Sequence, residues 1–341
     1  MKRFIRKVLK FILLPIIPLL LALFLFENYS HQSSFNDYSF NNSTESKIFK
    51  LPVTDSVNII VAGDSRAQRQ LIPKVIKSIT GINSINIATS SGDLVSTVPS
   101  LSAYNDKNIF IISASSWQIN DGAIDHGYLS DKCFQQLTLH EKVSIYGNDV
   151  KEIIWCYFDL IKLILKKDKY HYNDKTIKED GFYGVDDTLK IDPNHFTDFI
   201  NAHSWYKKIN TNSIREKIFS KSLEKLKERN SLIIIYQPPV SPYFKENIKN
   251  TAIDKFEKEY SKKLAKLCSK SDNIVFYDFY NKDISILENT MFYDHQHLNR
   301  NGAKLFSKIV SEKVISELKS RMNKNIPTKL HVSLNQRKRT F

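Results

Sequence analysis

The sequence predicts an α/β fold in which helices cover both faces of a central parallel sheet of about five strands. From residue 57 onward, short β-branched and apolar runs alternate with longer amphipathic segments, which is the pattern of consecutive strand–helix units. The chain has 341 residues, of which 42% are hydrophobic and 25% charged, so it can form one large globular domain. Ligands bind at the carboxyl ends of the strands in such sheets, and functional residues are therefore expected in the loops that follow them.

Three strands are expected in the first half of the domain, at residues 57–62, 84–89 and 108–113. One helix is predicted from about Arg66 to Thr80, with its apolar face at Leu71, Val75 and Ile79 and its end at Gly81. Strands and helices that alternate at this spacing favour a parallel sheet covered on both faces.

The second half repeats the pattern after an insertion. Strands are expected at 231–236 and 273–278, and helices at about 212–228, 251–269 and 303–322. The last helix is expected to pack through Leu305, Ile309, Val314 and Leu318. The proline-rich segment 238–242 follows the fourth strand and should stiffen a loop beside the site.

The regular rhythm is interrupted from about residue 117 to residue 205. Within this insertion, residues 152–167 form a mostly apolar run that is too short and too charged to span a bilayer. It fits a core helix, a helix on a membrane surface, or a face that meets a membrane partner. The neighbouring acids Asp186 and Asp187 are expected to be solvated turn residues without a catalytic role.

The N-terminus predicts one transmembrane helix. Residues 1–10 are basic, and the apolar run 11–26 would span about 24 Å as a helix, with flanking residues extending it. No small-x-small cleavage site follows, so an uncleaved signal anchor is favoured over a signal peptide. We expect an anchor at 1–27, a spacer at 28–56, the domain at 57–323 and a basic tail at 324–341, with everything after the anchor outside the cytoplasm.

The net charge is +14, and much of the excess lies beside the anchor and in the tail. No nucleic-acid motif accompanies it, so we expect contact with anionic lipid or an anionic polymer and no nucleic acid. The cysteines Cys133, Cys156 and Cys268 allow at most one disulfide, and buried free thiols are expected for Cys156 and Cys268.

Two separate stretches carry residues that could together form a hydrolytic triad. Ser65 follows the first strand in a tight turn, where its hydroxyl would be presented beside backbone N–H groups. Asp294 precedes His297 by three residues, so the carboxylate can orient the imidazole if the turn folds back. Together they predict a nucleophile, a general base and an orienting carboxylate.

The motifs Gly63-Asp64-Ser65, Asp294-x-x-His297 and His-Leu-Asn-x-x-Gly-Ala-x-x-Phe-Ser, from His297 to Ser307, resemble those of the SGNH (GDSL-type) esterases and acyltransferases. The last motif looks most like a membrane-anchored branch that includes alginate O-acetylation and teichoic-acid D-alanylation proteins. The resemblance implies a flavodoxin-like three-layer SGNH hydrolase fold at the bacterial cytoplasmic membrane. It also implies a cell-envelope polysaccharide or glycolipid substrate and a membrane-bound O-acyltransferase partner.

The resemblance also implies an oxyanion hole built from the N–H groups of Ser65 and Gly92 and from Asn120. The family's Gly-x-Asn-Asp block lacks its glycine here and lies several residues late, so Ser115 or another backbone N–H is an alternative third donor. Arg66 is predicted either to meet an anionic substrate or to be a solvated first-turn cation.

His295 is predicted to be a loop residue or to line the pocket. With Asp294 and His297 it also invites a metal site, but no fourth ligand is spaced to match, and we expect no metal and no cofactor.

Three functions stay open. Acyl transfer, with acetyl as the expected group, requires a sugar hydroxyl as the second nucleophile, whereas water would make the same site an esterase or deacetylase. The third function is a catalytically silent scaffold for a membrane-bound O-acyltransferase. The altered Gly-x-Asn-Asp block favours this function, and the complete set of Ser65, Asp294 and His297 opposes it.

Overall fold

The computed structural model describes residues 58–89, 94, 97, 98, 101, 104, 107–119, 181–202, 214–229, 231–269, 271–282 and 286–323. No helix in this part of the chain is long and apolar enough to cross a membrane. The predicted anchor, spacer and basic tail, the segment 152–167, and Cys133 and Cys156 lie outside the described residues.

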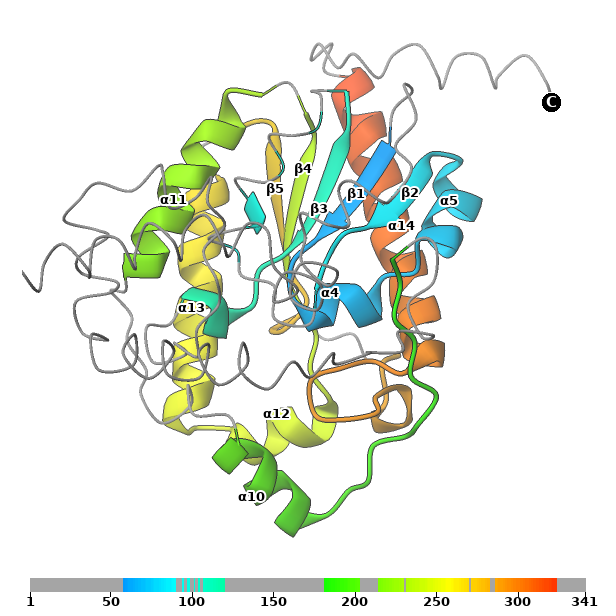
Figure 1. Cartoon of the computed structure of the whole chain (residues 1–341). Helices are drawn as coiled ribbons and strands as arrows, with labels where there is room; N and C mark the ends of the chain where they lie inside the picture. Colours follow the sequence, from blue (N-terminus) through cyan, green and yellow to red (C-terminus); the bar gives the residue numbers. More distant parts are fainter. Residues whose placement is uncertain are drawn as a thin grey trace, which may run out of the picture.

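The described residues contain a five-stranded parallel sheet, as the sequence predicts (Figure 1). Its strands are β1 (Asn58–Ala62), β2 (Asn83–Asn86), β3 (Ile109–Ser113), β4 (Ile233–Gln237) and β5 (Ile274–Asp278). They lie in the order β2-β1-β3-β4-β5, and every neighbouring pair is parallel. This order is consistent with a flavodoxin-like fold, in which ligands bind near β1 and β3, where the order reverses.

Helices cover both faces of this sheet (Figure 1). Because successive side chains of a strand point to opposite faces, Ile59 and Val61 belong to one apolar core while Ile60 and Ala62 belong to the other. The first core is closed by α5 (Pro73–Thr80) and α14 (Arg300–Asn323), and the second by α11 (Ile214–Lys227) and α13 (Ala252–Cys268). The α/β prediction is therefore confirmed.

Two helices replace the single helix predicted from Arg66 to Thr80. Helix α4 (Ser65–Gln70) ends before Leu71, and α5 begins at Pro73 after an extended Ile72. Proline cannot donate a backbone hydrogen bond, and it disfavours helical geometry in the residue before it. The break also turns α5, so that Ile76 is buried while Ile79 is exposed, contrary to the predicted face.

Two further helices lie at the carboxyl ends of the strands (Figure 1). Helix α12 (Pro242–Ile248) occupies the segment after the predicted proline-rich loop, with the Ser241 hydroxyl accepting a hydrogen bond from the Phe244 N–H at 3.1 Å. Serine before a proline in the first helical position is a common helix start, although only a stiff loop was predicted here. Helix α10 (Pro193–Ala202) belongs to the end of the insertion.

Helix α14 begins three residues before the predicted start. Asn299 caps it, accepting the Gly302 N–H through Oδ1 at 3.0 Å. The buried side of the helix includes Phe306, Val310, Val314 and Leu318. Leu305 and Ile309 were expected in this seam but are only partly buried at its edge.

Cys268, at the end of α13, is a buried free cysteine, as the sequence predicts. Burial raises the pKa of its thiol to about 12, so the thiol stays protonated and unreactive at neutral pH.

Replacing Gly302 with alanine is expected to lower the free energy of unfolding by about 2–3 kcal/mol. The new Cβ would lie 2.2 Å from the backbone oxygen of Met291 and 2.9 Å from Leu298 Cδ2, so α14 and the loop before it must separate. Urea unfolding of Gly302→Ala beside Asn301→Ala, a change at the exposed neighbouring position, measures the effect. Equal stability of the two variants would mean that this close approach is not needed.

Candidate active site

Ser65 follows a tight turn that requires glycine at position 63. Gly63, directly after β1, has a φ of +133°, and a Cβ there would come within 2.8 Å of Ser113 Cβ and 2.9 Å of the Ser113 carbonyl oxygen. Asp64 then caps α4 through its side chain, and Ser65 is the first residue of that helix. The partly exposed Ser65 hydroxyl is thus presented at the carboxyl end of β1.

A short hairpin-like loop carries Asp294 and His297. An antiparallel bridge joins Phe292 to Leu298, and the Tyr293 N–H donates to the His297 carbonyl at 3.1 Å. Asp294 Oδ1 accepts the backbone N–H groups of Gln296 and His297, both at 2.8 Å. These bonds fold the carboxylate back toward the ring, and Asp294 Oδ2 lies 2.8 Å from His297 Nδ1.

The two stretches meet although 232 positions separate them. Ser65 Oγ lies 2.7 Å from His297 Nε2, while the opposite ring nitrogen faces Asp294. An ionised carboxylate can only accept a hydrogen bond, so Nδ1 carries the ring proton and Nε2 is left to accept a hydrogen bond from the serine hydroxyl. The His297 and Asp294 side chains are 15% and 22% exposed, so the site is reachable from solvent.

Two hydrogen bonds hold these stretches together. The Gln70 side chain, at the end of α4, donates to the Gln296 carbonyl at 3.1 Å. Ser307, on α14, accepts the Ile72 N–H at 2.8 Å, which the break before Pro73 leaves without a helical partner. The Phe-Ser end of the C-terminal motif therefore anchors α4 and α5 to α14.

Asp294 is held ionised. Burial opposes its ionisation, but the charge and hydrogen bond of His297 and the two backbone N–H donors outweigh it and lower the pKa of the carboxyl to about 2. An acceptor for Nδ1–H is therefore present throughout the physiological range.

Asp64 is a fully buried carboxylate for which no role was predicted beyond its place in the motif. Its Oδ2 accepts from the Ser115 hydroxyl at 2.6 Å and from Trp117 Nε1 at 2.9 Å, and its Oδ1 accepts the Arg66 N–H at 3.1 Å. The Ser115 N–H donates to Gln118 Oε1 at 2.8 Å. Both donors of Ser115 are thus engaged in holding the turn, which corrects the expectation that Ser115 could serve as the third oxyanion donor.

Arg66 is buried and paired with a carboxylate, so it is not a solvated first-turn cation. It is 3% exposed, and its Nε lies 3.5 Å from Asp64 Oδ2. Its charge also acts on Glu257 of α13. Burial raises the pKa of the Glu257 carboxyl, and Arg66, Ser116 and Gln237 oppose that rise. The prediction for Arg66 is corrected: the residue balances buried carboxylates beneath the turn.

His295 lies in the loop before His297, as one of the two predictions has it, but it is buried and does not line an open pocket. Its ring centroid lies 4.8 Å from that of Phe199 and 5.3 Å from that of Phe196, both on α10. Its ring also stacks on that of Tyr243 of α12, with 5.8 Å between the centroids. Its backbone carbonyl accepts the Ser241 N–H at 3.0 Å. The aromatic packing explains the correction: His295 fixes the loop before His297 against α10 and α12.

The remaining predictions concern two oxyanion donors, a metal site and the acids at 186 and 187. Gly92 and Asn120 lie outside the described residues. No group of three His, Cys, Asp or Glu side chains in the described ranges could hold a metal ion. Asp186 forms a bidentate pair with Arg300 at 2.6 and 3.0 Å and is well exposed.

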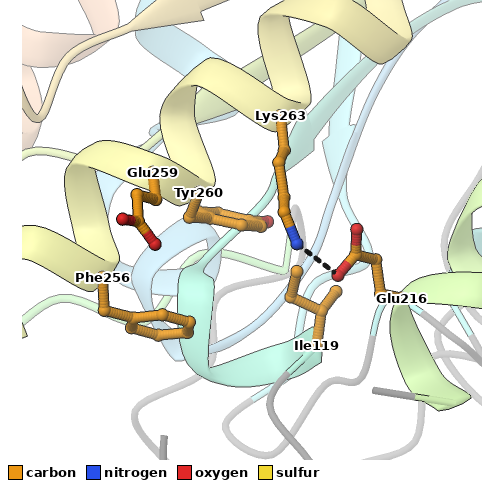
Figure 2. A pocket seen from close by; sticks show the side chains of 6 residues that line it. All are labelled: Ile119, Glu216, Phe256, Glu259, Tyr260 and Lys263. Carbon is orange, nitrogen blue, oxygen red and sulfur yellow. Dashed lines mark hydrogen bonds and ion pairs between the residues drawn. The ribbon is translucent and has the colours of Figure 1, made fainter. Parts of the chain in front are cut away.

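A small hollow lies between α11, α13 and the turn after β3 (Figure 2). A 3.0 Å ion pair between Lys263 and Glu216 crosses one side of it, and apolar side chains line most of the rest. None of the predicted site residues lines this hollow.

No protein-family model matches the chain, and no curated protein matches it.

Proposed function

We propose that this protein is a serine O-acyltransferase or esterase that works through an acyl-Ser65 intermediate. The observation that carries the proposal is the continuous chain from Ser65 Oγ to His297 Nε2 at 2.7 Å and from His297 Nδ1 to Asp294 Oδ2 at 2.8 Å. A serine hydroxyl is a weak nucleophile until a neighbouring base accepts its proton, and that base must be held in the correct tautomer.

In the first step, Ser65 Oγ attacks the carbonyl carbon of an ester while its proton passes to His297 Nε2. The resulting oxyanion is expected to accept hydrogen bonds from the Ser65 N–H and from the predicted donors at Gly92 and Asn120. Collapse of this intermediate breaks the bond to the alcohol, which leaves with the proton from His297. The acyl group remains on Ser65 as an ester.

In the second step, an acceptor hydroxyl gives its proton to His297 and attacks the acyl-serine. A sugar hydroxyl yields an O-acylated glycan, and water yields a free acid, so one site supports both reactions. Asp294 stays ionised in both steps and stabilises the imidazolium that forms each time, because the pKa of its carboxyl is held near 2.

The wider proposal combines this site with the N-terminal sequence. The basic and apolar start of the chain supports a single-pass anchor with the domain outside the cytoplasmic membrane. The sheet order and the motif set support an SGNH-type fold, with acetyl as the group transferred to an envelope polysaccharide or glycolipid. A membrane-bound O-acyltransferase is the proposed partner, as the donor of the acyl group.

Covalent labelling of the full chain with a fluorophosphonate tests the proposal. The wild type is expected to react at Ser65, whereas Ser65→Ala should not react and His297→Ala should react about 10²–10⁴-fold more slowly. Ser241→Ala, which removes a buried hydroxyl from the cap of α12, serves as a serine control that keeps labelling.

Failure of the folded wild type to react would overturn the proposal and favour the scaffold function. If labelling succeeds, incubation of the acetylated enzyme with and without a glycan acceptor separates transfer from hydrolysis. An O-acetylated glycan identifies a transferase, and acetate alone identifies an esterase.

A further inference from the structure

Tyr293 lies opposite the general base in the loop that carries both residues. The antiparallel bridge between Phe292 and Leu298 sets the register, and the next facing pair is Tyr293 and His297, whose backbones share a 3.1 Å hydrogen bond. Facing residues of antiparallel segments lie side by side, and neighbours along each segment point to opposite faces. Phe292 and Leu298 are fully buried in the core, so Tyr293 and His297 lie together on the other face, where both are partly exposed.

The two side chains on this face form an aromatic stack. The centroid of the Tyr293 ring lies 5.4 Å from that of His297, and the ring planes are inclined by 19°. This geometry is that of an offset stack, which is a favourable arrangement of aromatic rings. The torsion that rotates an imidazole about its Cβ–Cγ bond has broad minima, so a flat neighbour is an effective restraint on it. The Tyr293 ring thus limits the rotation of the general base.

The helix that carries the nucleophile also contacts the Tyr293 ring. Arg69 is on α4, four residues after Ser65, and its Cζ lies 5.3 Å from the centroid of Tyr293 and 4.9 Å from that of Tyr183. Cation–π attraction operates at these distances and does not depend on what else the guanidinium binds. One ring therefore contacts both the general base and the helix of the nucleophile, whose reacting atoms lie 2.7 Å apart.

The Tyr293 hydroxyl takes no part in these contacts. Its oxygen is buried and has no hydrogen-bond partner in the described part of the chain. The contacts with His297 and Arg69 are made by the ring, and a phenylalanine would keep them. The contributions of the ring and the hydroxyl can therefore be separated by substitution.

We propose that Tyr293 is a positioning residue for the reaction at Ser65, whose ring holds the His297 imidazole so that Nε2 meets the serine while Nδ1 meets Asp294. A general base needs both contacts at once, because it must reach the serine proton in the correct tautomer. The side chains of His297 and Asp294 are 15% and 22% exposed, so burial alone does not fix the imidazole. This inference deepens the proposed function and rests on it, because Tyr293 acts through the proposed base.

Steady-state cleavage of p-nitrophenyl acetate by the full chain tests the role of the ring. Tyr293→Leu is expected to lower kcat about 10–100-fold, because a misplacement of about 1 Å at a catalytic group can cost about 10²-fold. KM should change less than about threefold, since the ring acts on the base and not on substrate binding. Tyr293→Phe should lie within about twofold of the wild type in kcat, because it loses only a hydroxyl without a partner.

Tyr277→Leu is the matched control. The Tyr277 ring, on β5, stacks on that of Phe279 with 5.9 Å between the centroids and 15° between the planes. Its hydroxyl donates to Glu317 of α14 at 2.6 Å. The substitution removes a comparable stack from the fold and should lower stability, but kcat should stay within about twofold of the wild type. It therefore separates positioning of the base from general destabilisation.

Proton NMR of the full chain gives a readout that does not depend on turnover. A proton shared between an imidazole nitrogen and a carboxylate is strongly deshielded, so Nδ1–H of His297 should give a low-field resonance that Asp294→Asn removes. Tyr293→Phe should keep this resonance, whereas Tyr293→Leu should broaden it, because a rotating ring exchanges the proton with water. If Tyr293→Leu does not fold, Tyr293→Met, which fills the space without a flat face, decides by the same two measurements.

Three results would each overturn the inference: a kcat of Tyr293→Leu within about threefold of the wild type, an equal loss in Tyr293→Phe, or an unchanged low-field resonance in Tyr293→Leu. Any of them beside normal labelling of Ser65 refutes this inference alone. A folded wild type that neither cleaves the ester nor reacts at Ser65 refutes the proposed catalysis, and the resonance in Tyr293→Leu then still decides whether the ring positions His297.

Discussion

Replacing Asp294 with asparagine is expected to lower kcat for ester cleavage about 10³–10⁴-fold while the protein stays folded. The carboxylate accepts Nδ1–H of His297 at 2.8 Å, which leaves Nε2 free to accept the proton of Ser65. An asparagine amide can donate to Nδ1 instead, and the ring then carries its proton on Nε2, the wrong tautomer for a base. Steady-state kinetics with a p-nitrophenyl ester measure the loss, which should appear in kcat more than in KM.

Asp186→Asn is the matched control, because Asp186 is an exposed acid paired with Arg300 and should affect kcat less than twofold. Retention of more than a tenth of wild-type kcat in Asp294→Asn would remove Asp294 from the mechanism.

The stability lost in Asp294→Asn, relative to wild type, is expected to depend on pH. The folded-state pKa of Asp294, about 2, lies below its ordinary value of 3.8, so the ionised carboxylate stabilises the fold. That contribution is fully present above about pH 4 and is lost as the pH falls toward 2. The difference in unfolding free energy between wild type and Asp294→Asn should therefore shrink over this interval. A constant difference would show that Asp294 is not held ionised by folding.

The strands were predictable because their signal is local. Runs such as the one at β4, which is buried at all five positions, contain β-branched residues without alternation and are typical of central strands in a covered sheet. The motifs at Ser65 and His297 were likewise visible, because each depends on a short sequence with its own turn geometry. Their 2.7 Å approach follows once the parallel order places both loops at one edge of the sheet.

The predictions that were wrong concern side chains whose surroundings come from distant segments. Arg66 looked exposed because it follows the nucleophile, but Asp64 and Glu257, nearly 200 positions apart in sequence, enclose it. His295 was predicted to be a loop residue or to line the pocket. It lies in a loop, but α10, which belongs to the insertion, covers it with Phe196 and Phe199 and keeps it out of an open pocket. A helix pattern or a short motif contains no information about such partners.

Asp64 allows the largest stability prediction. Replacing it with alanine is expected to cost about 3–5 kcal/mol of unfolding free energy, because Arg66 would be left buried without its carboxylate. Ser115 and Trp117 would lose their acceptor as well. Denaturant unfolding measures the cost, and Asp64→Asn, which keeps an acceptor for the helix cap but not the charge, should lie between alanine and wild type.

A double variant separates the charge from the cap. Adding Arg66→Met to Asp64→Ala should restore part of the lost stability, because an apolar side chain replaces the uncompensated buried cation. Recovery is expected to be incomplete, since Arg66 also opposes the rise in the pKa of Glu257 that burial causes. Asp64→Ala within 1 kcal/mol of wild type would contradict the role of the network. If the prediction holds, labelling at Ser65 should fall in Asp64→Ala even where the variant remains folded, because Asp64 caps the turn that holds Ser65 against His297.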